Sequence, residues 1–247
     1  GSEIIPSHKG LHRVQDPYSL RCIPQVLGAC LAAIEFAEGT VQIEMNSATD
    51  NPLLFPEEGE SLSGGNFHGQ AVAMALDHVS LAMAVLAGFS ERRTARLVDG
   101  RLSELPAFLV ARGGLNAGLM VAQYVAAGYA SDNKVLAHPA SADSIPTSAN
   151  QEDYVPMGMA AALKARTALE NAQRVVALEY LTAAQGLEFL KPLSPGRGPR
   201  AAYDLVRTRV RPLEDDRSLA PDVERILEWM RRGALVAAAE NAVGRLD

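Results

Sequence analysis

The sequence predicts a mainly α protein built as a bundle of long helices. Apolar residues make up 48% of the 247 residues, aromatic residues make up only 5%, and alanine is abundant. Small side chains let helices approach closely, so this composition favours helix-on-helix packing. Apolar residues also recur at helical spacing over long stretches, with no sustained strand-like alternation. A chain of this length can bury a sizeable core in one or two domains.

The first long helix is expected over residues 25–46. Its apolar positions recur three or four residues apart, at Val26, Ala29, Ala33, Ala37 and Val41. A polar cluster at residues 46–51 and Pro52 predict its end, because proline cannot continue a helix. Residues 55–66 are polar and glycine-rich, which predicts a loop.

Three further segments complete the expected bundle. Residues 67–98 have Met74, Leu81, Val85 and Leu86 among their apolar positions, and residues 115–136 continue the helical pattern. The last long helix is expected to begin near Pro156, where proline suits a first helical turn, and to continue toward residue 190.

A proline- and glycine-rich stretch at residues 191–199 predicts a linker or sharp turn. We therefore expect a central helical-bundle part over residues 1–190 and a C-terminal helical extension over residues 191–247. Within the extension, shorter amphipathic helices are expected at residues 200–210 and 221–232. The alanine-rich residues after about 232 are expected to fray.

Composition limits the class of partner. A net charge of −6 gives no reason to expect a nucleic-acid partner. No apolar run is judged long enough to span a membrane, and no secretory signal opens the chain. Cys22 and Cys30 are too few for a disulfide framework and lack zinc-type partners. We expect a reduced, cytoplasmic protein that binds neither nucleic acid nor membrane.

Residues 15–21 (QDPYSLR) place a phenol and a guanidinium three positions apart, beside a proline that fixes the local backbone. A tyrosine that exchanges a proton needs a nearby cation to stabilise its phenolate, and an arginine can hold a carboxylate through two parallel hydrogen bonds. Tyr18 and Arg21 therefore suit an enzyme that binds an amino or carboxylic acid and moves one of its protons. Spacing alone favours a plainer interpretation, in which Tyr18 caps a core and Arg21 is a solvated charge.

Four segments carry a resemblance to a known family. They are residues 14–28 (VQDPYSLRCIPQVLG), 46–53 (NSATDNPL), 63–70 (SGGNFHGQ) and 138–158 (HPASADSIPTSANQEDYVPMG). In this order they resemble histidine ammonia-lyases, in the aromatic amino acid lyase family, from about residue 8 to about residue 190. The resemblance implies a helical bundle of the aromatic amino acid lyase or fumarase–aspartase type. It also implies active-site loops at residues 15–21, 63–70 and 138–158.

The resemblance assigns roles to the first two loops. It implies that Tyr18 works on the β-proton of the substrate, that Arg21 holds the substrate carboxylate, and that Gln15 lies beside them in the pocket. Phe67 matches the family aromatic residue that packs over the electrophile and the substrate ring; without the flanking match, a core phenylalanine at a helix start would be preferred. His68 is expected to make a structural hydrogen bond and is left out of the catalytic set.

The third loop carries the residues expected to select the substrate. Asp143, Gln151, Glu152 and Asp153 precede a helix, so the plain interpretation is that they cap it. By resemblance, Glu152 is a candidate catalytic residue placed against the imidazole or amino group, and Gln151 is a candidate substrate-binding residue. A carboxylate can accept an imidazole N–H that a phenyl ring lacks, so Glu152 favours histidine. Tyr154 and Pro156 stand where the family pattern predicts histidine and serine.

The resemblance implies elimination of ammonia from L-histidine to give trans-urocanate, without metal or nucleotide. The family's electrophile is a methylidene-imidazolone made from an internal Ala-Ser-Gly, and this chain has no such tripeptide. The resemblance begins part-way through the family pattern, so we expect a C-terminal part that needs the missing N-terminal half and is inactive alone. The family forms homotetramers, so the helices at 67–98, 115–136 and 156–190 are expected to build a tetramer core.

Three alternatives stay open at this point. One is a fumarase- or aspartase-type lyase, which also has long helices and a serine-containing loop comparable to SIPTSAN, but a different glycine–serine signature. Another is a non-catalytic helical fragment or scaffold. The third is a tyrosine or phenylalanine ammonia-lyase or aminomutase of the same family.

Overall fold

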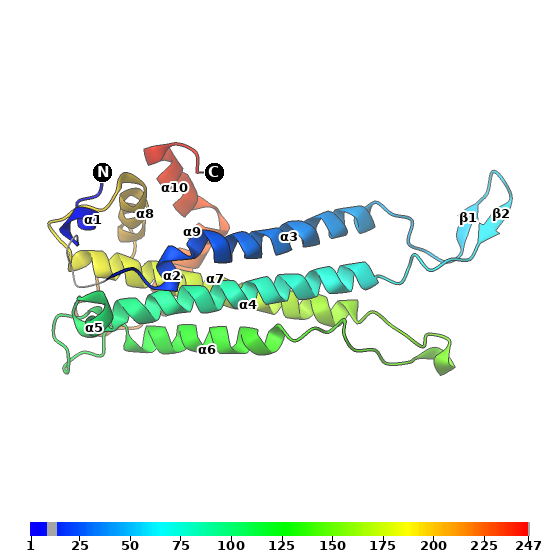
Figure 1. Ribbon diagram of the computed structural model, residues 1–247, viewed down its shortest axis with the longest axis horizontal. Coiled ribbons are helices and arrows are strands. Elements are labelled where there is room, and N and C mark those ends of the chain that lie inside the picture. Colours follow the sequence, from blue (N-terminus) through cyan, green and yellow to red (C-terminus); the bar gives the residue numbers. More distant parts are fainter. Residues whose placement is uncertain (9–13, 247) are drawn as a thin grey trace. The chain divides into compact units, whose positions relative to one another are not determined.

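The computed structural model describes residues 1–8 and 14–246 and is mainly helical, which confirms the predicted fold class (Figure 1). It divides into two compact units. The first unit comprises residues 1–22, 87–130 and 173–247, and the second comprises residues 23–86 and 131–172. The expected division near residue 190 stays a prediction, and residues 9–13 of its first part lie outside the described residues.

The second unit is built from helix α3 (Ile23–Met45) and parts of three longer helices. These are the start of α4 (Gln70–Val98), the end of α6 (Met120–Leu136) and the start of α7 (Gly158–Glu188). Their buried apolar positions are mostly alanine, as in Ala73, Ala75, Ala82, Ala161, Ala165 and Ala168. Close helix packing through small side chains therefore follows directly from the composition.

A buried amide joins three of these helices. The side chain of Asn133 on α6 donates to the backbone oxygens of Ala168 on α7 at 3.0 Å and Met83 on α4 at 3.4 Å. Its own oxygen accepts a hydrogen bond from the Asn171 amide at 3.0 Å. Because Asn133 is fully buried, these bonds replace water and fix the register of the three helices.

Helices α3 and α4 are both long and apolar enough to cross a membrane, contrary to the expectation from sequence. Only 11% of the apolar stretch of α3 and 39% of that of α4 is buried. One edge of α3 packs on α4, where the Cys30 thiol meets the backbone oxygen of Ala82 at 3.6 Å and the ring of Phe36 lies edge-on to His78. An alanine-rich helix of a bundle can have the same length and hydropathy as a membrane span, so these two properties do not distinguish the two.

A short hairpin replaces part of the loop predicted at residues 55–66. Strand β1 (Leu53–Phe55) pairs antiparallel with β2 (Glu60–Leu62), in a register that sets Leu54 against Ser61. Gly59, with φ of 69°, supplies the left-handed turn residue that closes the hairpin. The hairpin stands beyond the ends of α3 and α4 (Figure 1). The prediction failed because two three-residue strands are too short to show alternation.

Three of the long helices begin later than their periodicity suggests, whereas α3 begins two residues earlier, at Ile23 rather than residue 25. α4 starts at Gln70 rather than residue 67, after Gly69 with φ of 69°. α6 starts at Met120 rather than residue 115, because Asp216 accepts the backbone N–H groups of Ala117 and Gly118 and holds them outside the helix. α7 starts at Gly158 rather than Pro156. Left-handed and side-chain-bonded residues thus set the boundaries that apolar spacing misses.

The first unit collects the remaining helices around the other ends of α4, α6 and α7. They are α1 (Ile4–Ser7), α2 (Tyr18–Arg21), α5 (Gly100–Ser103), η1 (Ala107–Leu109), α8 (Arg197–Arg207), α9 (Ala220–Arg231) and α10 (Ala234–Val243). Buried Gln185 on α7 donates to the backbone oxygens of Leu109 and Leu213 at 3.1 and 2.9 Å, and its oxygen accepts the N–H of Leu213. One side chain thereby fixes two irregular segments.

The expectation of fraying after residue 232 is wrong. Residues 234–243 form α10, which buries Leu235 and packs against α8. At Gly198 on α8 an added Cβ would lie 3.6 Å from Val243, so the two helices approach closely there. Tertiary burial stabilises an alanine-rich terminus that would fray in isolation.

Candidate active site

The first unit contains the tyrosine and arginine singled out from the sequence. Pro17 adopts an extended conformation and its oxygen accepts the N–H groups of Leu20 and Arg21 at 3.0 and 3.1 Å, which forms the single turn of α2. The Arg21 guanidinium lies 4.6 Å from the centre of the Tyr18 ring. A cation at this distance is attracted to the aromatic face of the tyrosine ring.

Both side chains are open to solvent. Tyr18 is 68% exposed, and Gln15 and Arg21 are also exposed. Among the described residues, no hydrogen bond uses the Arg21 guanidinium, so its N–H donors are available to a carboxylate. The local turn therefore brings Tyr18 and Arg21 together, as the spacing predicted, but does not enclose them.

The second unit contains the loop of Phe67. The Asn51 side-chain oxygen accepts the N–H of Gly64 at 2.9 Å and ties this loop to the segment after α3. Phe67 is 55% exposed and lines a cavity of about 340 Å³ together with Val41, Met45 and Val72. An added Cβ at Gly64 would meet no atom within 4 Å, so the loop has room for a neighbouring group.

The loop before α7 is organised around Glu152. Its carboxylate oxygen Oε2 accepts hydrogen bonds from the hydroxyls of Thr147 at 2.6 Å and Ser148 at 2.9 Å. These two bonds, that from Thr147 being the stronger, hold the pKa of Glu152 below its ordinary value. Gln151 follows the short η2 turn (Ser148–Asn150), and its N–H donates to the oxygen of Ser148 at 3.1 Å. Both Gln151 and Glu152 are exposed.

His68 connects these two loops of the second unit. Its Nε2 atom lies 2.8 Å from the backbone oxygen of Tyr154, and its ring stacks on the Tyr154 ring with centres 6.0 Å apart. The residue next to Phe67 is therefore bonded to the residue two positions after Glu152. His68 makes the structural hydrogen bond expected from its position at a helix start.

Asp77 holds the start of the loop that carries Glu152, a role that was not predicted from the sequence. It is 6% exposed, and its two carboxylate oxygens accept the N–H groups of Ala140 at 3.0 Å and Ser141 at 2.8 Å. The start of the Glu152 loop is thereby anchored to α4. The Lys164 ammonium of α7 donates to the backbone oxygen of His138 and ties the same segment to α7 as well. An aspartate within the apolar stretch of α4 was the available signal.

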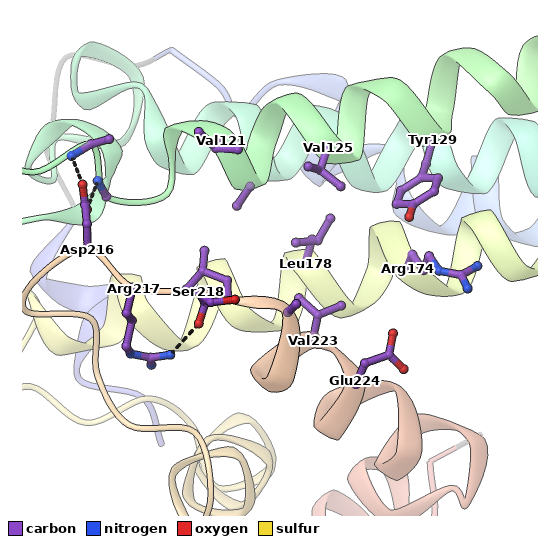
Figure 2. Close-up of a pocket in the computed structure, with 15 residues that line it drawn as sticks. Val121, Val125, Tyr129, Arg174, Leu178, Asp216, Arg217, Ser218, Val223 and Glu224 are labelled. Carbon is purple, nitrogen blue, oxygen red and sulfur yellow. Dashed lines mark hydrogen bonds between the residues drawn. The ribbon is translucent and has the colours of Figure 1, made fainter.

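The first unit also has an apolar cavity of about 490 Å³, shown in Figure 2. Val121 and Val125 of α6, Leu178 of α7 and Val223 of α9 line it. At one end, Arg174 lies 5.7 Å from the Tyr129 ring centre, with Glu224 nearby (Figure 2). None of the residues predicted from the sequence to act on the substrate lines this cavity.

The six predicted site residues thus form two groups. Gln15, Tyr18 and Arg21 belong to the first unit, whereas Phe67, Gln151 and Glu152 belong to the second. Within the part of the chain that the structure describes, no three His, Cys, Asp or Glu side chains are grouped as metal ligands. Each group offers an exposed polar or aromatic surface.

Comparison with known proteins relates the whole chain to one family. The pattern of the aromatic amino acid lyase family matches residues 1–208. A histidine ammonia-lyase of Symbiobacterium thermophilum is 55% identical over 243 residues, which is 98% of this chain and 48% of that protein. This chain spans about half the length of the curated relatives it matches.

Two solved structures have the same fold as this chain. The crystal structure of histidine ammonia-lyase from Trypanosoma cruzi matches with a TM-score of 0.89 and 46% identity, covering 93% of this chain and 45% of that one. Tyrosine aminomutase from Streptomyces globisporus matches with a TM-score of 0.85 and 37% identity, covering 97% of this chain and 47% of that one.

Proposed function

Because the chain belongs to the aromatic amino acid lyase family, we propose that it forms the C-terminal part of a histidine ammonia-lyase. The complete enzyme would eliminate ammonia from L-histidine to give trans-urocanate. The observation that carries this proposal is 55% identity, over nearly the whole chain, to a relative that bears that name. The carboxylate of Glu152 supports histidine as substrate, since a phenyl ring has no N–H to donate to it.

The family's methylidene-imidazolone supplies an electrophile when it is present. No Ala-Ser-Gly occurs in the 247 residues, so we place the source of that group in a separate N-terminal half. The loop at residues 63–67 fits the group as a neighbour, because Phe67 is exposed and an added Cβ at Gly64 or Gly65 would meet nothing within 4 Å. Phe67 would pack against the group, and residues of this chain would bind the substrate and remove its proton.

In this proposal Arg21 binds the substrate carboxylate and Tyr18 removes a proton from the β-carbon. The electron pair of that C–H bond becomes the second bond of the new carbon–carbon double bond, while the C–N bond breaks and ammonia leaves with the electron pair of that bond. The Arg21 guanidinium lies 4.6 Å from the centre of the Tyr18 ring, so the group that binds the carboxylate and the group that removes the proton stand next to each other. Glu152 accepts a hydrogen bond from an N–H of the substrate, and Gln15 and Gln151 are the further substrate-binding residues.

We also propose that the enzyme is a cytoplasmic homotetramer. α3 exposes Leu31, Phe36, Ile43 and Met45, and α4 exposes Met74, Leu81 and Val85. Exposed apolar surface on this scale favours packing against further helices. Sedimentation of the complete enzyme as a monomer would contradict the tetramer.

The reaction is tested by measuring ammonia and urocanate released from L-histidine, with L-tyrosine and L-phenylalanine as comparison substrates. The chain alone is expected to be inactive, and the enzyme that includes the N-terminal half is expected to prefer L-histidine. Turnover by the chain alone would contradict the requirement for a second segment. A preference for L-tyrosine, with a β-amino acid as product, would favour an aminomutase like the solved relative.

Tyr18→Phe removes only the phenol oxygen and tests the proton-transfer role. In the complete enzyme we expect kcat to fall by roughly 10²–10⁴-fold while KM changes little. Tyr124→Phe, at an exposed tyrosine of α6, is the matched control. Turnover of Tyr18→Phe close to that of the control would disprove the role of Tyr18.

Glu152→Gln tests substrate selection. The amide has lost the charge that attracts an imidazole or ammonium N–H, so kcat/KM for L-histidine should fall by about tenfold or more. Use of L-phenylalanine should fall less, because its ring makes no such bond. An unchanged ratio of the two substrates would disprove the selectivity argument.

A further inference from the structure

Glu152 is held in place before any substrate arrives. Two hydroxyl groups, of Thr147 and Ser148, lie 2.6 and 2.9 Å from the same carboxylate oxygen, Oε2. An ionised carboxylate can only accept hydrogen bonds, so both hydroxyls must donate. Among the described residues, none donates to the other oxygen, Oε1.

The backbone around this carboxylate is strained. Ser148, Ala149 and Asn150 have φ of 50°, 53° and 66°, a left-handed region that residues other than glycine adopt at a cost. Thr147 and Glu152 close the turn by exchanging two backbone hydrogen bonds, at 2.9 and 3.3 Å. The two side-chain bonds to Glu152 span the same turn and therefore help to keep it closed.

We propose that Thr147 and Ser148 are positioning residues that select the substrate through Glu152. Their hydroxyls donate to Oε2 of Glu152, so the other oxygen, Oε1, is the one that accepts a hydrogen bond from an N–H of the substrate. A carboxylate that is already fixed loses little conformational entropy on binding, and its hydroxyl partners keep it ionised. This inference rests on the proposed function, in which Glu152 contacts the substrate.

Thr147→Val is the informative substitution because it removes the hydroxyl and keeps the branched shape. Thr147 is extended, with φ of −131° and ψ of 177°, a conformation that valine adopts readily. Thr147→Ser restores the hydroxyl without the methyl group. Thr167→Val is the matched control, since Thr167 is an exposed residue of α7 whose hydroxyl donates only to its own helix, at the oxygen of Leu163.

Steady-state kinetics of the complete enzyme with L-histidine give the first readout. Thr147→Val should raise KM by roughly three- to tenfold, the loss expected for a hydrogen bond to an exposed charged group, with a smaller change in kcat. Thr147→Ser should restore most of the affinity, and Thr167→Val should match the wild type. The proposal is overturned if Thr147→Val binds L-histidine as well as Thr167→Val does, or if Thr147→Ser is as poor as Thr147→Val.

Hydrogen exchange of the 247-residue chain gives a readout that needs no activity. The N–H of Glu152 donates across the turn to Thr147, so Thr147→Val should speed its exchange while Thr167→Val should not. Equal exchange rates of the Glu152 N–H in the two variants would show that the Thr147 hydroxyl does not hold the loop, and would overturn the proposal. If the wild-type enzyme fails to release ammonia from L-histidine, the proposed function fails, and exchange at Glu152 still decides whether the hydroxyls hold the loop.

Discussion

Asp77 offers the sharpest test of how the Glu152 loop is anchored. Asparagine has the shape of aspartate but only one side-chain oxygen, so in Asp77→Asn one of the N–H groups of Ala140 and Ser141 must face an amide NH₂. A hydrogen bond to a charged group contributes about 1.5–3 kcal/mol, and an orphaned buried donor adds its own cost. We expect the free energy of unfolding to fall by about 2–3 kcal/mol.

Urea denaturation of the 247-residue chain, followed by circular dichroism at fixed protein concentration, measures this loss. Asp132→Asn, at an exposed position of α6, is the control and should change the unfolding free energy by less than about 0.5 kcal/mol. Hydrogen exchange at residues 140 and 141 should accelerate only in Asp77→Asn. A loss no larger than that of the control, with unchanged exchange, would refute the anchoring role.

The same carboxylate predicts a dependence on pH. Burial raises the pKa of Asp77, but hydrogen bonds from Ser141 and Ala140 and the charge of Lys164 outweigh burial and leave the pKa lowered. A lowered pKa in the folded state gives stability that is present above the unfolded value of about 3.9 and is lost as the pH falls through the folded value. The advantage of the wild type over Asp77→Asn should therefore shrink below about pH 4, and a constant difference down to about pH 3 would contradict it.

Two further predictions concern a buried hydrogen bond and a backbone conformation. Asn133→Ala should lower the free energy of unfolding by about 2–4 kcal/mol because it leaves the Asn171 amide unpaired. Asn171→Ala should then cost at least about 1 kcal/mol less in the Asn133→Ala background than in the wild type. Strictly additive losses in urea denaturation would refute the pairing. Gly118→Ala should cost about 2–4 kcal/mol, since φ is 59° and a Cβ would lie 2.5 Å from the oxygen of Phe108. Gly128→Ala, on open surface of α6, should be neutral or stabilising by up to about 1 kcal/mol, and equal melting temperatures for the two glycine variants would refute this argument.

The long helices could be predicted because their signal is local and repeated. Apolar residues three or four apart mark α3, α4, α6 and α7 within a few residues of their observed bounds. The exact starts of α4, α6 and α7 were missed, since a left-handed residue or a distant carboxylate decides each one, as Asp216 does at α6. The β1–β2 hairpin and α10 were missed for two other reasons. A three-residue strand has no period to detect, and an alanine-rich terminus is stabilised by burial against α8.

The candidate site could be predicted in part from the sequence. Tyr18 and Arg21 are neighbours on one helical turn, so their spacing alone brings them together. An aspartate in an apolar stretch marked Asp77 as unusual, but its partners could not be predicted, because they are two N–H groups more than sixty residues away. The link between His68 and Tyr154 is likewise set by loops that meet only in the folded chain.

The sequence by itself determined the helical class, the four segments that resemble the lyase family, and the absence of an Ala-Ser-Gly tripeptide. These are properties of residue type and short spacing, which do not depend on what surrounds them. Only the tertiary structure decided that Glu152 is clamped by Thr147 and Ser148 through one oxygen. Three left-handed residues fold the chain back at that point, and no sequence pattern specifies such a turn without glycine.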